Sequence, residues 1–159
     1  MATPIIRRAT RDDILTIVGF NQAMALETED ISLDTSILLP GVEAIFENPE
    51  HGFYIVCEIE GLVKACLMIT YEWSDWRNGI FWWIQSVFVK KEYRKRGLYK
   101  LMYEFIKTQI DKDSEIIGLR LYVDDDNVKA QNVYTKLGMK KSNYQLFEYT
   151  KPKTIVLNT

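Results

Sequence analysis

The sequence is poor in the side chains that most often carry metals or redox chemistry. Its 159 residues include one histidine, His51, and two cysteines, Cys57 and Cys66. The cysteines lie in apolar, strand-like stretches without a CxxC spacing, which is typical of buried reduced thiols. We therefore expect no metal site and no mechanism that depends on histidine.

Long apolar runs and a large net charge are also missing. No segment approaches the roughly 18 uninterrupted apolar residues that would span a bilayer. The N-terminal stretch MATPIIRRATRDD lacks the apolar core of a signal peptide. We therefore expect a cytoplasmic protein with no membrane partner. The net charge of −2 makes nucleic acid an improbable partner as well.

Apolar and aromatic residues are plentiful, at 47% and 13% of the chain. This content predicts one domain over residues 1–159 that buries its own core. No repeat or linker interrupts it, and a homodimer is compatible with the composition.

Residue patterns predict an alternation of strands and helices. Strands are expected over 5–10, 52–59, 62–73, 80–89, 116–123 and 144–150, with a tight hairpin at Glu60 and Gly61. Helices are expected from about 12 to 27, from Asp34 or Thr35 either to just before Pro40 or on toward Phe46, after Gly97, and over 127–138. This order predicts an α/β fold, a mixed sheet with helices on its faces.

A strongly basic turn joins the strand that ends at Val89 to the next helix. Five of the seven residues from Lys90 to Arg96 are cationic, and Gly97 follows them. Glycine lets a ligand approach the backbone, and the first N–H groups of a helix attract anions, so the turn is suited to a phosphate. A solvated basic turn is the alternative. The spacing fits neither a P-loop nor a dinucleotide-binding GxGxxG motif.

Two motifs in this region resemble signatures of the GNAT (Gcn5-related N-acetyltransferase) superfamily. VFVKKEYRKRGLY resembles its acyl-CoA pyrophosphate signature through Arg94 and Gly97, although Tyr99 replaces the usual small residue. LYVDDDNVKAQNVYTKLGM resembles the second signature at Asn127, Ala130, Tyr134 and Gly138. The resemblance implies a mostly antiparallel, twisted sheet of six to seven strands, splayed after the fourth strand, with about four helices on its faces.

The resemblance also implies acetyl-CoA as cosubstrate, without a metal. The residues expected to bind it are Val87, Phe88, Val89, Arg94, Lys95, Arg96, Gly97, Leu98, Tyr99, Lys100, Asn127 and Ala130. Tyr134 is the expected general acid for the CoA thiolate, and its alternative role is packing against the sheet. The implied activity is N-acetyl transfer by direct attack of an amine on the thioester.

The acceptor site is less well marked. Gln85 occupies the position where spermidine/spermine acetyltransferases carry a glutamate. Glutamine cannot accept a proton usefully, so the sequence does not identify the general base. We expect Glu27, Glu29, Glu72 and Asp75 to line one cleft with Trp76 and Gln85, which would favour a small cationic amine. A protein N-terminus or lysine as acceptor, or a non-catalytic acyl-CoA sensor, are the alternatives.

Overall fold

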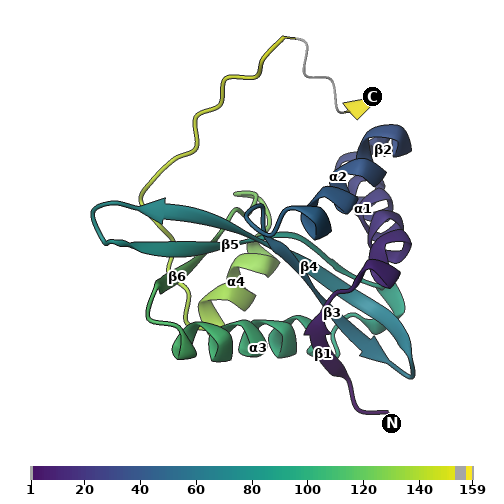
Figure 1. Ribbon diagram of the computed structural model, residues 1–159, viewed down its shortest axis with the longest axis horizontal. Coiled ribbons are helices and arrows are strands. Elements are labelled where there is room, and N and C mark those ends of the chain that lie inside the picture. The colour runs from purple at the N-terminus through teal and green to yellow at the C-terminus, as the bar shows by residue number, and fades with distance from the viewer. Residues whose placement is uncertain (1, 153–156, 159) are drawn as a thin grey trace. The chain divides into compact units, whose positions relative to one another are not determined.

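The computed structural model describes residues 2–152 and 157–158 of the chain. Its helices are α1 (Ile14–Glu29), α2 (Thr35–Glu47), α3 (Leu98–Lys112) and α4 (Val128–Lys136). Its strands are β1 (Ile5–Arg8), β2 (Ser32–Leu33), β3 (Phe53–Ile59), β4 (Leu62–Ser74), β5 (Gly79–Val89), β6 (Ile116–Leu121) and β7 (Leu157–Asn158). Short 3₁₀ turns, Arg11–Asp13 and Lys91–Tyr93, precede α1 and follow β5. Figure 1 shows these elements along the chain.

The chain divides into two compact units. The first comprises residues 1–121 and 156–159, and the second comprises residues 122–155 with α4 as its helix. All of the strands lie in the first unit. The expectation of a single domain stays a prediction.

The main sheet has five strands in the order β1-β3-β4-β5-β6, and β2 pairs with β7 separately. All neighbours in the main sheet are antiparallel except β5 and β6, which are parallel. The α/β class, the mixed sheet and the four helices are therefore confirmed. Among the described residues the central sheet has five strands, fewer than the six to seven expected.

The strand predicted over 144–150 is the reason for that difference, because the structure has no regular element there. Tyr144, Phe147 and Tyr149 are 82%, 89% and 89% exposed. A strand needs a neighbour to accept and donate its backbone hydrogen bonds. The described part of the second unit contains no strand that could pair with this segment.

The turns and caps follow from local chemistry. Glu60 and Gly61 have φ of 52° and 73°, the left-handed conformations that a two-residue hairpin between twisted strands requires. Asp34 caps α2 by accepting a hydrogen bond from Ser36 N–H at 2.8 Å. The helix then continues through Pro40 to Glu47, so the longer of the two predicted second helices is correct.

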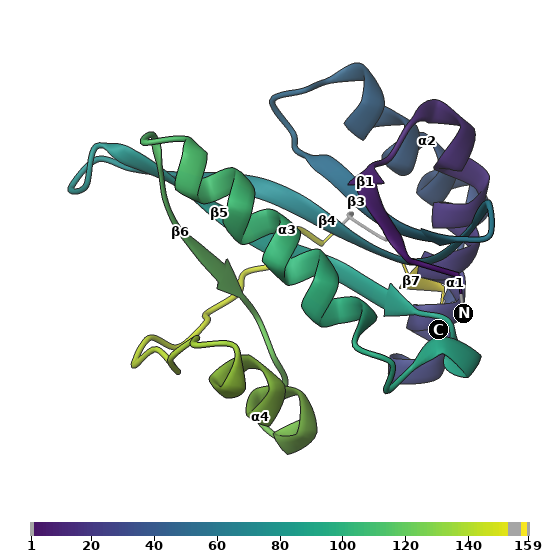
Figure 2. The same cartoon turned by 90° about the horizontal axis from the view of Figure 1, so that it is seen from below.

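Helices cover both faces of the sheet. On one face α1 and α2 bury a cluster that includes Ile17, Val42, Val56, Cys66 and Phe88. Strand side chains alternate between faces, so Leu67 and Ile69 of β4 point the other way, where α3 contributes the buried Met102 and Ile106. Figure 2 shows α3 crossing in front of the strands. The β4–β5 hairpin extends beyond α1 and α2 (Figure 1), which leaves part of their face of the sheet open.

Candidate functional site

A bulge interrupts β5 near its end. Two residues of β5, Ser86 and Val87, stand opposite a single residue of β4, Leu67. Ser86 has φ of 50°, in the left-handed region, which costs a residue with a Cβ roughly 1–2 kcal/mol. A bulge turns the strand and changes the direction of the residues that follow it.

Beyond the bulge, one edge of β5 is open. The pairing with β6 covers Ile80–Ile84 only, whereas β4 pairs with the other edge as far as Val89. Figure 2 shows β6 diverging from β5. Lys90 N–H donates to Lys64 O at 2.9 Å, toward β4. Because backbone groups alternate in direction along a strand, those of Val89 and Val87 point toward the open edge. The predicted splay after the fourth strand of the sheet is therefore confirmed.

The open edge leads into the basic turn and then into α3. Lys95 and Gly97 both have left-handed φ, of 62° and 77°. The first backbone hydrogen bond of α3 runs from Leu101 N–H to Gly97 O at 3.1 Å. The N–H groups of residues 98–100 precede it and lie at the positive end of the helix. The turn therefore combines backbone donors with cationic side chains.

Arg94 holds the turn to the first helix. Its Nε donates to Val89 O at 2.9 Å, and its two terminal nitrogens donate to both oxygens of Glu27 on α1, Nη2 at 2.8 Å. The bond from Arg94 holds the pKa of the Glu27 carboxyl below its usual value. The sequence assigned Arg94 to the pyrophosphate, but its guanidinium is already occupied here by Glu27 and a carbonyl.

The remaining cations of the turn face solvent. Lys95 and Arg96 are exposed, and the Arg96 guanidinium carbon lies 5.0 Å from the centre of the Tyr93 ring. Lys100 is exposed too, with its Nζ 3.7 Å from Glu104 one helical turn later. Leu98 is buried, so at this position only the backbone can contact a ligand. Lys95 and Arg96 are thus the side chains best placed to meet an anion at the turn.

A chain of polar contacts runs along the open part of the α1/α2 face. Gln85 Nε2 donates to Thr70 Oγ1 at 2.5 Å, and Trp83 Nε1 donates to Glu72 Oε1 at 2.7 Å. Arg120 on β6 donates to Glu72 Oε2 at 2.9 Å. Its guanidinium carbon also lies 3.7 Å from the centre of the Phe81 ring. This polar face begins next to the bulge and ends near the hairpin tip.

The predicted carboxylates do not come together in one cleft. Glu27 is bound to Arg94 beyond the end of β5, whereas Glu72 pairs across from Phe81. Phe81 and Val89 are eight strand residues apart, which is about 26 Å. The predicted grouping was wrong because the sequence positions of charged residues do not indicate which end of the sheet each one will lie at.

The other predicted acceptor residues are also separated. Asp75 lies in the β4–β5 turn, where it accepts from Trp76 N–H at 2.8 Å, and the Trp76 side chain is 91% exposed. Glu29 is the exposed last residue of α1. Gln85 and Glu72 are the two that share one surface.

Three predicted residues belong to the second unit. Asn127 caps α4, because its Oδ1 accepts from Ala130 N–H at 3.1 Å. Tyr134 lies within α4, and burial raises the pKa of its hydroxyl above the usual value. Gly138 ends the helix with φ of 93°. Their roles toward a cosubstrate stay predictions.

The cysteines are free and buried, as predicted, and burial raises the pKa of the Cys66 thiol to about 12. Within residues 2–152 and 157–158, His, Cys, Asp and Glu side chains form no group of three that could hold a metal ion. The same residues contain no helix with the length and apolar character to cross a membrane.

Comparison with known proteins identifies this arrangement. The family model described as the acetyltransferase (GNAT) family matches residues 20–139, which include the second half of α1, the bulge, the basic turn and α4. The chain belongs to the GNAT acetyltransferase family. A search of curated proteins found no significant match.

Solved structures support the GNAT assignment. The chain is 44% identical to a protein described as a possible acetyltransferase from Clostridium difficile 630, with a TM-score of 0.87, over 93% of this chain and 97% of that one. Glucosamine-6-phosphate N-acetyltransferase from Arabidopsis thaliana shares the fold at 23% identity and a TM-score of 0.71, over 94% and 99%. An aminoglycoside N-acetyltransferase in complex with CoA shares it at 14% identity and a TM-score of 0.76, over 96% and 97%.

In this GNAT chain, sequence patterns do not predict two features of the site. The ion pair between Glu27 and Arg94 joins residues 67 positions apart, and no local pattern marks it. The bulge at Ser86 also has no signal, because serine is not a residue that prefers left-handed backbone. The sequence shows only that Ser86, a short polar residue, lies between two apolar stretches of the strand.

Proposed function

We propose that this GNAT acetyltransferase transfers an acetyl group from acetyl-CoA to the primary amine of a small molecule by direct attack on the thioester. The observation that carries the proposal is the open β5 edge leading into the basic turn and the N-terminus of α3. An edge of free backbone groups suits the amides of pantetheine. A helix N-terminus flanked by cations suits a pyrophosphate.

The pyrophosphate is assigned to the N–H groups of residues 98–100 with the exposed Lys95 and Arg96. Arg94 acts as a positioning residue, since it holds the turn against α1 and the end of β5. Gly97 is required because its φ of 77° would strain any other residue. Within the Val87–Val89 segment, the backbone groups of Val87 and the N–H of Val89 would pair with the pantetheine arm, because Val89 O already accepts from Arg94.

In the reaction, the neutral amine attacks the carbonyl carbon of the thioester, a C–N bond forms, and the C–S bond breaks to release CoA thiolate. The oxygen becomes negative in the transition state, and a backbone N–H at the open edge would stabilise it. The attacking nitrogen gives up one proton, and the thiolate gains one.

Tyr134 is the proposed donor to the thiolate. Its hydroxyl is protonated at neutral pH, as a proton donor must be, and burial holds its pKa above the usual value. Asn127 and Ala130 at the start of α4 are assigned to the pantetheine arm on the strength of the family signature.

We assign the role of general base to no carboxylate of the chain. Glu27 is a poor candidate, since its lowered pKa and its two bonds to Arg94 oppose proton uptake. Gln85 cannot accept a proton usefully. We therefore propose that the attacking amine is neutral either because water takes its proton in the site or because the small neutral fraction of the amine is the form that binds. Water also takes the proton that the nitrogen loses after the attack.

The acceptor is placed on the polar face formed by Gln85, Thr70, Trp83 and Glu72. This face begins at the bulge, next to the proposed thioester position, and its tryptophan ring suits a cationic amine. The Glu72 carboxylate is already paired with Arg120, so it would orient the amine only by sharing its oxygens. Protein N-termini and lysines are the competing acceptors, and a non-catalytic acyl-CoA sensor is the competing class, favoured by the glutamine at position 85.

The test is release of free thiol from acetyl-CoA with a panel of amines, with calorimetric binding of CoA measured alongside. Thiol release with small amines supports the proposal, and release with peptides only supports the protein-acetylating alternative. Tight CoA binding without release for any amine would identify a sensor.

A further inference from the structure

A second ligand site lies beside the basic turn, on the α1 side of the sheet. A cavity of about 600 Å³, open to solvent on one side, lies between α1, the start of β4 and the turn that follows β5. Cavities of 300–1,000 Å³ are typical of small-molecule sites. Leu15, Phe20 and Phe88 supply apolar wall, so an occupant has an apolar or planar body.

The charged residues of the cavity do not balance. Four cations line it, Lys64, Lys90, Lys91 and Arg94, with two carboxylates, Glu27 and Glu92. Arg94 and Glu27 neutralise each other through their paired hydrogen bonds. Three lysines therefore remain with one carboxylate.

Lys64 is the decisive residue, because it is only 8% exposed. Its Nζ lies 4.9 Å from the centre of the Tyr93 ring. Among the described residues, no carboxylate lies within ion-pair distance of that nitrogen. The stem of Lys64 is packed against the protein, whereas its ammonium keeps access to the cavity and lies over the Tyr93 ring. An ammonium held in this way can meet an anion that enters the cavity.

This cavity is separate from the proposed acetyl-CoA edge. β5 lies between β4 and β6, the cavity is lined from β4 and α1, and the open edge of β5 faces the β6 side. The cavity uses turn residues 90–92 and 94, whereas the proposed pyrophosphate site uses residues 95–100. The two sites therefore use different residues of the same turn.

We propose that this cavity binds a phosphate monoester with an apolar or planar body, and that the Lys64 ammonium is its principal anchor. Lysine is a point-charge ligand for phosphate, and three lysines with one carboxylate leave a net positive charge for a dianion. The phosphate can come from the nucleotide end of CoA, through its 3′-phosphate, or from a separate phosphorylated molecule.

The test uses phenyl phosphate as probe in calorimetry and thermal melting of the full chain. Lys64→Met keeps the length of the side chain and removes the charge, and Lys107→Met on the exposed face of α3 is the matched control. We expect phenyl phosphate to bind wild type and Lys107→Met alike, and at least tenfold more weakly to Lys64→Met. Saturating probe should raise the Tm of wild type and leave that of Lys64→Met unchanged.

Equal affinity of wild type and Lys64→Met for phenyl phosphate, or no binding to wild type, would overturn the proposal. Should Lys64→Met fail to fold, Lys90→Met provides the same comparison, with a several-fold loss expected.

CoA and dephospho-CoA distinguish the two sources of the phosphate. If the anchor takes the 3′-phosphate, wild type prefers CoA to dephospho-CoA, Lys64→Met loses that preference, and only CoA displaces phenyl phosphate. If the ligand is a separate molecule, phenyl phosphate binds together with either. Failure of both cofactors to bind would refute the proposed function and leave the phenyl phosphate result standing.

Discussion

Ser86 carries the backbone irregularity on which the open edge of β5 depends. Its φ of 50° is tolerated by glycine and resisted most by β-branched residues. We expect Ser86→Val to lose about 1–2 kcal/mol of unfolding free energy and to weaken CoA binding. Ser86→Gly should keep both within error. Denaturant unfolding and calorimetry provide the measurements, and a Val variant as stable as wild type would show that the bulge is not strained.

A substitution of Tyr134 tests the proposed chemistry most directly. Tyr134→Phe removes one hydroxyl and keeps the ring, so fold and CoA affinity should be retained. Turnover should fall by about 10²- to 10⁴-fold, the usual contribution of a general acid. Steady-state kcat with an identified amine measures this. A Phe variant within a factor of two of wild type across the pH range would assign the tyrosine to packing.

At the scale of elements, one ion cluster joins three segments that are distant in sequence. Arg7 on β1 donates to Asp13 Oδ2 at 2.8 Å, ahead of α1, and to Glu58 Oε2 at 3.0 Å on β3. Asp13 also accepts from Thr10 N–H at 2.7 Å. Burial alone would raise the pKa of Asp13, but the bonds from Arg7 and Thr10 outweigh it and leave that pKa below its usual value.

This cluster predicts how stability depends on pH. Because the folded pKa of Asp13 is lowered, its contribution is present above the unfolded pKa of about 3.9 and is lost as pH falls through the folded pKa. Asp13→Asn should therefore cost about 1–3 kcal/mol at pH 7, and the difference from wild type should shrink below about pH 4. Urea unfolding at several pH values measures it, with the exposed Asp12→Asn as control. A difference that stays constant down to pH 2 would contradict the assignment.

Elements were predictable where their signal is local. The apolar spacing of Leu98, Leu101, Met102, Phe105 and Ile106 predicted α3. Leu98, Met102 and Ile106 are buried in the structure, whereas Leu101 is 37% exposed. The hairpin at Glu60 and Gly61 was equally clear, since few residues accept its backbone angles. The strand over 144–150 failed, because its alternating pattern indicates strand propensity and cannot supply the neighbouring strand that pairing requires.

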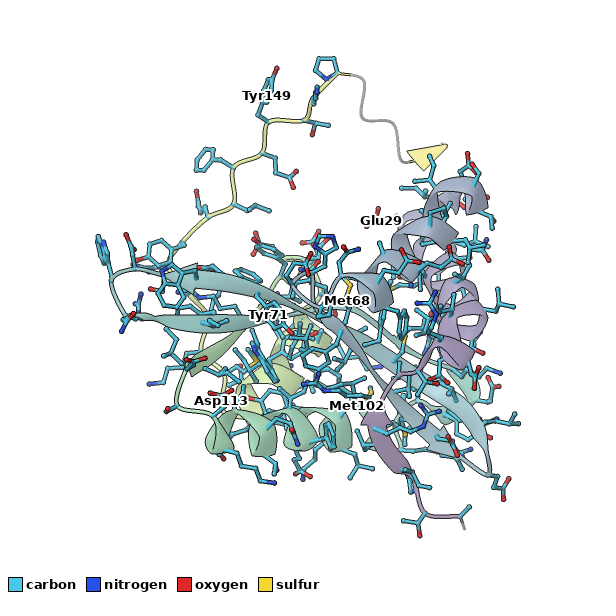
Figure 3. The ribbon with its side chains drawn as sticks, viewed as in Figure 1. Glu29, Met68, Tyr71, Met102, Asp113 and Tyr149 are labelled. Carbon is cyan, nitrogen blue, oxygen red and sulfur yellow. The ribbon has the colours of Figure 1, made fainter. Side chains whose placement is uncertain are left out.

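At the scale of the whole molecule, that segment gives a direct test. Tyr144, Phe147 and Tyr149 are exposed on a stretch without regular structure, and Figure 3 labels Tyr149 there. Chymotrypsin should therefore cut first within residues 144–149, before any buried aromatic such as Tyr54 is reached. Mass spectrometry of short digests identifies the sites. Protection of this segment in the folded protein would instead favour the strand that the sequence predicted.

The sequence by itself determined the family, the order of elements and the basic turn, because motif spacing, apolar periodicity and turn chemistry act over a few neighbouring residues. Tertiary structure decided which charges meet. It joined Arg94 to Glu27, buried Lys64 beneath Tyr93 without a carboxylate, and separated Glu27 from Glu72 along the sheet. The physical reason is that such contacts depend on strand register and helix placement, which bring together residues that no local pattern relates.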